Sequence, residues 1–256
     1  MLRIIALLAF ALIPVLALAQ PMPPPPSAEE RGLDLLRLEG MESYAAWRER
    51  FGWRDLRPFS DSRARFQVLD GVLRLESRGE SFLIGGDLPP RLRKSIAEYP
   101  YLRFTVRIGA VPRGARLAGE EADDAAFRIY AVFGLQPWQA LAYVWSWSLP
   151  VGEWSARGRS VWGDFRRVRR KAFGKGEPFS ELWLTVEVDL RRDFRAQFPR
   201  QALPVLRGLA LKSDSNDTAG QRSLAWLRGV SLHRTSLAEA GYENWYPYRG
   251  GTLWFR

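Results

Sequence analysis

The chain has 256 residues and no cysteine, and its 38 Lys and Arg residues outnumber the 28 Asp and Glu residues, which gives a formal net charge of +10. The missing cysteines exclude disulfides, thiol nucleophiles and a cysteine-linked lipid anchor. Eleven Trp residues and a hydrophobic content of 46% exclude a largely disordered chain. The positive charge by itself would suit a nucleic-acid-binding protein, but the first residues argue against that partner.

The chain begins with the pattern of an export signal. Arg3 precedes an apolar run from Ile4 to Leu18, and Ala17 and Ala19 form a small-x-small cleavage motif. The apolar run is shorter than the roughly 20 residues that a membrane-spanning helix needs. We therefore expect the run to be cleaved off rather than retained as an anchor.

This signal predicts a division of the chain into three parts. Residues 1–19 are the expected signal peptide, residues 20–34 a Pro-rich linker, and residues 35–256 a single β-sandwich domain. The mature protein is then periplasmic or secreted, with no transmembrane segment after cleavage. Export separates it from nucleic acid, so an anionic component of the cell envelope is the expected electrostatic partner.

Alternating apolar and polar residues predict strands along most of the chain, after a short helix expected at Ala28–Leu38. Asp70-Gly71 supplies the positive-φ residues of a type I′ turn and predicts a hairpin over Arg65–Ser77. Further short helical segments are expected at Pro89–Glu98 and Arg191–Phe198. The other strands expected, in chain order, are Tyr101–Arg107, Ala126–Phe133, Leu141–Ser148, Leu182–Leu190, Val205–Lys212 and Ala225–His233.

Many strands with few helices indicate an antiparallel sandwich or barrel. Long helices do not alternate with the strands, which argues against a parallel α/β sheet. The sequence therefore predicts an all-β protein with a few short helices.

Familiar catalytic patterns are scarce. His233 is the only histidine, so a Ser-His-Asp triad would have to use it, and no G-x-S-x-G motif supplies the serine. No His and Cys spacing indicates zinc, and no glycine-rich loop indicates phosphate binding. The sequence leaves the question of catalysis open and favours a protein that is not an enzyme.

Acidic and amide residues gather in two predicted loops. Asp123 and Asp124 precede one strand, and Asp214, Asn216 and Asp217 follow another. If both loops lie at the same end of a sandwich, their oxygens would form one site for Ca²⁺ or for sugar hydroxyls. A carboxylate pair there would also serve glycoside hydrolysis. Turns use the same residue types for purely structural reasons.

Aromatic residues share one face of a predicted strand. Tyr143, Trp145 and Trp147 alternate along the chain, and such rings stack on the apolar faces of sugars. A stripe of this kind also forms the core of many sandwiches. Both interpretations stay open on sequence grounds.

Five stretches, taken in order, resemble an exported bacterial family. They are Leu69–Ser77, Tyr99–Phe104, Asp123–Gly134, Ala142–Ser146 and Ser213–Thr218. In order and content they are similar to domain-of-unknown-function family 3047, over roughly residues 35 to 235. The resemblance implies, by analogy with galactose-binding-like domains, an antiparallel β-sandwich of jelly-roll type. It implies no activity.

Together these observations predict a monomeric, non-catalytic, exported domain that binds carbohydrate or another cell-envelope ligand, with Ca²⁺ as the one cofactor considered. The alternatives are a carboxylate-dependent glycan hydrolase or lyase, and a structural or assembly protein of the envelope. The predicted ligand-binding residues are Asp123, Asp124, Arg128, Tyr143, Trp145, Asp214, Asn216 and Asp217.

Overall fold

A computed structural model gives the fold. It describes residues 32–56, 65–115, 124–135, 138–155, 167–177, 182–218, 221–239, 245–248 and 251–255. The expected signal peptide and most of the expected linker lie outside these ranges. Within them, no helix is long and apolar enough to cross a membrane.

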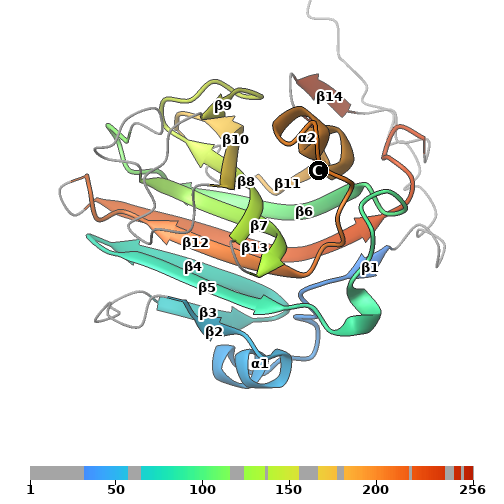
Figure 1. Ribbon diagram of the computed structural model, residues 1–256. Coiled ribbons are helices and arrows are strands. Elements are labelled where there is room, and N and C mark those ends of the chain that lie inside the picture. The colour runs from blue at the N-terminus through green and yellow to red at the C-terminus, as the bar shows by residue number, and fades with distance from the viewer. Residues whose placement is uncertain are drawn as a thin grey trace, which may run out of the picture.

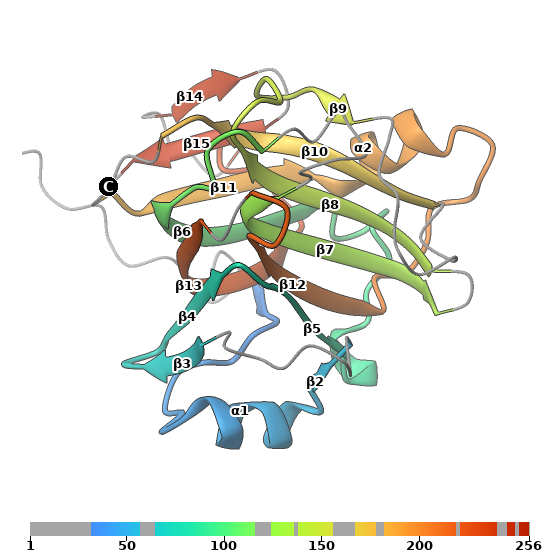
Figure 2. The same cartoon turned by 90° about the vertical axis from the view of Figure 1, so that its left-hand side faces the viewer.

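The described residues form two β-sheets packed face to face (Figures 1 and 2). The eight-stranded sheet has the order β14-β15-β11-β6-β13-β4-β3, with β1 also paired to β13. Its strands are β1 Leu33–Asp34, β3 Arg65–Leu69, β4 Val72–Arg78, β6 Tyr101–Ala110, β11 Leu184–Asp189, β13 Arg222–His233, β14 Trp245–Tyr248 and β15 Gly251–Phe255.

The seven-stranded sheet has the order β2-β5-β12-β7-β8-β10-β9. Its strands are β2 Arg54–Asp55, β5 Ser81–Asp87, β7 Ala125–Leu135, β8 Trp138–Ser146, β9 Trp154–Ser155, β10 Arg167–Lys175 and β12 Gly208–Asp214. We call the side of each sheet that faces away from the other sheet its outer face.

The connections between the sheets are those of a jelly roll. Strands β4 to β7, and later β11 to β13, pass alternately from one sheet to the other. The result is β4-β13-β6-β11 packed against β5-β12-β7-β8, with every neighbouring pair antiparallel. This confirms the predicted fold class. β10 departs from the pattern because it pairs with β8 in parallel.

The predicted hairpin is confirmed. β3 and β4 pair antiparallel, and Asp70 and Gly71 between them have φ values of 50° and 70°. Two positive φ values are what a type I′ turn requires, and Asp and Gly are among the residues that tolerate them best.

The helix predictions were mixed. The helix expected at Ala28–Leu38 is wrong over the residues described there, where β1 forms and Arg37 has a left-handed φ of 53°. A helix that the periodicity did not predict, α1 Tyr44–Phe51, follows; the Ser43 hydroxyl caps it by accepting the Ala46 N–H at 3.1 Å. α1 lies at the edge formed by β2 and β3 (Figure 1).

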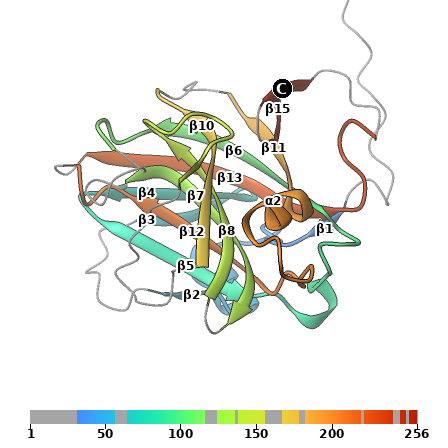
Figure 3. The ribbon, with the colours of Figure 1, turned by 45° about the horizontal axis from the view of Figure 1, so that its top comes forward.

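Two other short helical segments match expectation. The single 3₁₀ turn Pro90–Leu92 falls within the expected Pro89–Glu98 segment. The helix α2 Leu190–Gln197 agrees with the expected Arg191–Phe198 and begins where the Asp189 carboxylate accepts the Arg192 N–H. α2 lies at one end of the sandwich, near β6 and β8 (Figure 3).

The main core fills the space between the sheets. Phe173 on β10 meets the rings of Phe104 on β6 and Phe127 on β7 edge to face, with centroid distances of 5.2 Å and 6.1 Å. A second apolar cluster lies on the outer face of the seven-stranded sheet. Its members include Leu83, Tyr130, Val132, Ala140, Ala142, Val144 and Ala210.

Candidate functional site

The outer face of the seven-stranded sheet carries polar groups in two regions, one toward each end of β12. Residues of β12 alternate between the core, where Leu209 and Leu211 lie, and the outer face, where Ala210 lies. Gly208 belongs to the first polar region and Asp214 to the second. The two regions differ in how their charges are exposed.

The Asp214 region contains a buried group that we call the ion cluster: Arg128, Lys212 and Asp214. Arg128 on β7 and Lys212 on β12 are register partners. Arg128 Nη2 lies 3.2 Å from Asp214 Oδ2, and Lys212 Nζ donates to the same oxygen. Arg128 and Asp214 are fully buried, and Lys212 is 7% exposed. Their mutual attraction opposes the cost of removing three charges from water.

Asp124 ties the next loop to this region. Its carboxylate accepts the Asp217 N–H at 3.1 Å and the Thr218 hydroxyl at 2.6 Å. Burial raises the pKa of Asp124 above its usual 3.8, the charge of Asp214 raises it further, and the hydrogen bond from Thr218 opposes the rise. Asp124 and the 214–218 loop therefore meet at the same end of the sandwich, which was the condition for a shared site on sequence grounds.

Four serines continue the buried polar network behind the ion cluster. Ser213 contacts Ser77 at 3.1 Å and Ser223 at 2.8 Å, and Ser77 contacts Ser215 at 3.0 Å. All four side chains are fully buried. This network links β4, β12 and β13, so it joins the two sheets at this end of the sandwich.

The structure separates the predicted acidic site into interior and surface residues. Asp124, Arg128 and Asp214 are fully buried, whereas Asn216 and Asp217 are exposed at the loop, where the Asn216 amide donates to the Asp217 carboxylate. The predicted Asp123 lies outside the described residues. The interior residues have the contacts of structural supports for the loop.

The predicted stacking surface is not present on the outside of the sandwich. Tyr143 is fully buried and Trp145 is 2% exposed, because both rings point into the core between the sheets. The Tyr143 hydroxyl donates to Asp193 of α2 at 3.1 Å, and Lys171 Nζ donates to the same carboxylate at 2.8 Å. Burial raises the pKa of Tyr143 well above its usual value. The pair therefore has core contacts in place of a sugar-binding face.

The carboxylates of the region already have partners. Asp214 faces two cations, and Asp124 accepts a backbone and a hydroxyl donor. Over the described ranges, no group of three or more His, Cys, Asp or Glu side chains is placed to hold a metal ion.

The single histidine belongs to another buried network, in the eight-stranded sheet. Arg103 Nη1 lies 3.0 Å from His233 Nδ1, and Arg103 Nε donates to Glu187 at 2.7 Å. Since a guanidinium can only donate, His233 Nδ1 accepts, and Nε2 is left to donate to the Ser231 hydroxyl at 2.8 Å. These contacts are those of a structural histidine.

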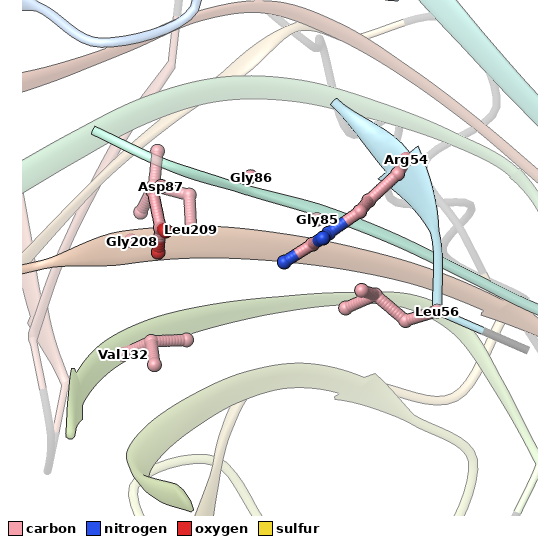
Figure 4. A pocket seen from close by; sticks show the side chains of 8 residues that line it. All are labelled: Arg54, Leu56, Gly85, Gly86, Asp87, Val132, Gly208 and Leu209. Atoms are coloured by element: carbon pink, nitrogen blue, oxygen red, sulfur yellow. The ribbon is translucent and has the colours of Figure 1, made fainter. Parts of the chain in front are cut away.

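The Gly208 region contains a shallow depression of about 310 Å³, including the part open to solvent. We call it the glycine pocket (Figure 4). Figure 4 shows Arg54 and Leu56 on one side and Asp87 and Val132 on the other. The residues that line it are Arg54, Leu56, Gly85, Gly86, Asp87, Val132, Gly208 and Leu209.

Missing side chains create the pocket floor. Gly85 on β5 is the register partner of Arg54 on β2, and a Cβ at Gly208 would lie 2.9 Å from the Gly86 carbonyl oxygen. The charged side chains of Arg54 and Asp87 are exposed above this buried floor. No sequence pattern considered above indicated the pocket, although glycines inside a strand commonly mark a close approach of backbone or ligand.

Comparison with known families identifies the family of this chain. The family model described as "Protein of unknown function (DUF3047)" matches residues 59–231, so the chain belongs to that family. No curated protein matches the chain.

Several solved structures are similar to the chain, and two of them illustrate the low identity. One is an agarase, AgWH50C, at 10% identity and a TM-score of 0.29; the match covers 72% of this chain and 25% of the agarase chain. The chain thus spans a quarter of that protein's length. The other is a loop-swap mutant of Xyn11A from Necallimastix patriciarum, at 9% identity and a TM-score of 0.30, with 70% and 94% of the two chains covered.

Proposed function

We propose that the protein is an exported, non-catalytic domain that binds a carbohydrate of the cell envelope in the glycine pocket. The observation that carries this proposal is the placement of Arg54 and Asp87, two exposed charges of opposite sign on either side of a floor bare of side chains. The exported location rests on the signal-like residues 1–19.

The chemistry of the pocket suits a sugar ring. Leu56 and Val132 offer apolar surface to the C–H face of the ring. The guanidinium of Arg54 donates hydrogen bonds to ring or hydroxyl oxygens, and the carboxylate of Asp87 accepts them from hydroxyl groups. The depression is shallow and open to solvent, so we expect it to hold one sugar unit of a longer chain.

The charges around the pocket favour binding over hydrolysis. Glycoside hydrolysis generally uses two carboxyl groups that flank the scissile bond. Among the described residues that line the pocket, Asp87 supplies one carboxylate. Asp124 and Asp214, the carboxylates that the sequence analysis considered, are fully buried in their own contacts.

A glycan array probed with the full chain tests the proposal. We expect selective binding that weakens about 10-fold or more in Arg54→Ala and in Asp87→Ala, because each removes a charge-assisted hydrogen bond. Arg200→Ala and Glu98→Ala are matched controls, since both side chains are exposed and neither lines the pocket.

Two results would overturn the proposal. If the chain binds no glycan, or if the pocket variants bind like the controls, the glycine pocket is not the site. If bound glycans are cleaved by the purified chain, the domain is an enzyme and its non-catalytic assignment fails.

A further inference from the structure

The outer face of the eight-stranded sheet carries a second surface feature that the glycine pocket does not explain. The side chains of Arg107, Trp183, Trp226 and Arg228 stack on one another there, and we call them the tryptophan–arginine patch. The Arg107 guanidinium lies 4.0 Å from the ring centroid of Trp226 and 5.4 Å from that of Trp183. The Arg228 guanidinium lies 4.5 Å from the ring centroid of Trp183.

These side chains lie outside the core because successive residues of a strand point to opposite faces of the sheet. Val106, Leu184 and Leu227, their neighbours along the chain, point into the main core. Arg107, Trp183 and Trp226 are half-buried and Arg228 is exposed. Two large rings therefore remain partly open to solvent although each would gain by full burial.

Backbone geometry lets one ring lie close against the sheet. Arg107 and Trp226 are register partners on β6 and β13, and a Cβ at Gly109 would come within 2.5 Å of the Trp226 ring. Gly109 therefore makes room for the indole. The Nε of Arg107 is buried and makes no hydrogen bond among the described groups, so stacking with the indole rings is its principal contact.

The charge around the patch is predominantly positive. Arg74 on β4 is the register partner of Trp226 on the side of β13 away from β6. Arg74 and Arg222 both pair with Glu76. Along this part of the face the described cations thus outnumber the carboxylates. The cations are Arg74, Arg107, Arg222 and Arg228, and the carboxylate is Glu76.

We propose that the tryptophan–arginine patch binds an anionic polysaccharide, one built of uronic or sulfated sugars. The indole faces of Trp183 and Trp226 offer stacking surface to sugar rings. Arg228, exposed beside Trp183, pairs with the carboxylate or sulfate group of the same sugar. A patch laid across neighbouring strands suits an extended polymer.

This surface is independent of the glycine pocket. The pocket lies on the outer face of the seven-stranded sheet, and the patch lies on the outer face of the other sheet. A protein with both sites would hold two polysaccharide chains on opposite sides of the sandwich. Failure of one proposal leaves the other standing, because different variants test them.

Affinity electrophoresis of the full chain through gels that contain polygalacturonate tests the proposal, with dextran gels as the neutral reference. We expect retardation by polygalacturonate that declines as salt increases. Trp183→Ala and Arg228→Ala should each weaken it about 10-fold, and Arg228→Glu should abolish it. Arg228→Lys, which keeps the charge but loses the planar stacking group, should lie between Arg228→Ala and the unchanged protein.

The control variants are chosen from other surfaces. Trp154→Ala removes a half-buried tryptophan from the seven-stranded sheet, and Arg200→Ala removes an exposed charge that belongs to neither the patch nor the pocket; both should leave retardation unchanged. Thermal melts of each variant separate loss of binding from loss of fold. Equal retardation of Trp183→Ala, Arg228→Glu and the unchanged protein overturns the proposal. So does binding to vesicles of anionic phospholipid without binding to polygalacturonate.

Discussion

The two polar regions of the seven-stranded sheet are joined by one strand but use charge in opposite ways. At one end of β12, Asp214 is fully buried between Arg128 and Lys212. At the other end, Gly208 leaves a depression between the exposed side chains of Arg54 and Asp87. The buried charges pair with one another beside the 214–218 loop, whereas the exposed charges can contact a ligand. The conspicuous acidic motif is therefore the structural one.

The largest expected effect is a loss of stability in the buried ion cluster when Asp214 is removed. Asp214→Ala leaves Arg128 and Lys212 as buried cations without their shared carboxylate, so we expect the free energy of unfolding to fall by about 3–5 kcal/mol. Denaturation with urea measures it. Asp87→Ala, at the exposed end, should change stability by no more than about 0.5 kcal/mol. Similar losses in the two variants would contradict the distinction drawn between the two regions.

A smaller effect is expected in the floor of the glycine pocket. Gly208→Ala places a Cβ 2.9 Å from the Gly86 carbonyl oxygen, where backbone has to move, and we expect a loss of about 1–3 kcal/mol. Gly229→Ala is the matched control on β13, because a Cβ there meets no atom within 4 Å. Equal stability of the two variants by urea denaturation would show that the floor is not closely packed.

The smallest effect concerns pH and sharpens the role of Asp124. Its pKa is raised in the folded protein, first by burial, so the fold retains this proton to a higher pH than the unfolded chain does. The raised pKa of Asp124 therefore stabilises the fold fully below pH 3.8, the usual pKa. This stabilisation is lost as the pH rises through the raised pKa of the folded protein.

Asp124→Asn removes that titration and keeps an oxygen to accept the Thr218 hydroxyl. Acidification through this window should therefore raise the free energy of unfolding less in the variant than in the unchanged protein, by up to about 1 kcal/mol. Urea denaturation at a series of pH values measures the difference. Glu187 and Asp193 also have raised pKa values, but both residues are present in both proteins. They therefore do not change the difference between the two pH profiles. Parallel pH profiles would contradict the assignment.

The strands and the hairpin could be predicted because they depend on neighbours in sequence. Period-two alternation marks a half-buried strand wherever it occurs, and Asp70-Gly71 favours a tight turn through its own backbone preferences. The convergence of Asp124 with the 214–218 loop was only a condition on sequence grounds, because no local pattern shows which strand ends meet. The helix at Tyr44–Phe51 was missed because one of its residues, Trp47, is buried, so it has little apolar periodicity to detect.

The position of Tyr143 and Trp145 could not be decided in the same way. Their strand has apolar residues on both faces, since Ala142 and Val144 lie in the outer cluster while Tyr143 and Trp145 lie in the core. Alternation identifies two faces but not which of them meets the other sheet. The packing of the sandwich made that choice.

The sequence alone determined the β-rich class, the turn at Asp70-Gly71 and the grouping of acidic residues into two loops, because these depend on local backbone preferences and on burial of alternate side chains. Tertiary structure alone decided the two surfaces proposed as binding sites. Gly208 reaches Gly86 and Asp87, and Arg107 reaches Trp183 and Trp226, only because strands far apart in the chain become neighbours in a sheet. Such contacts depend on strand pairing and register, which no local pattern specifies.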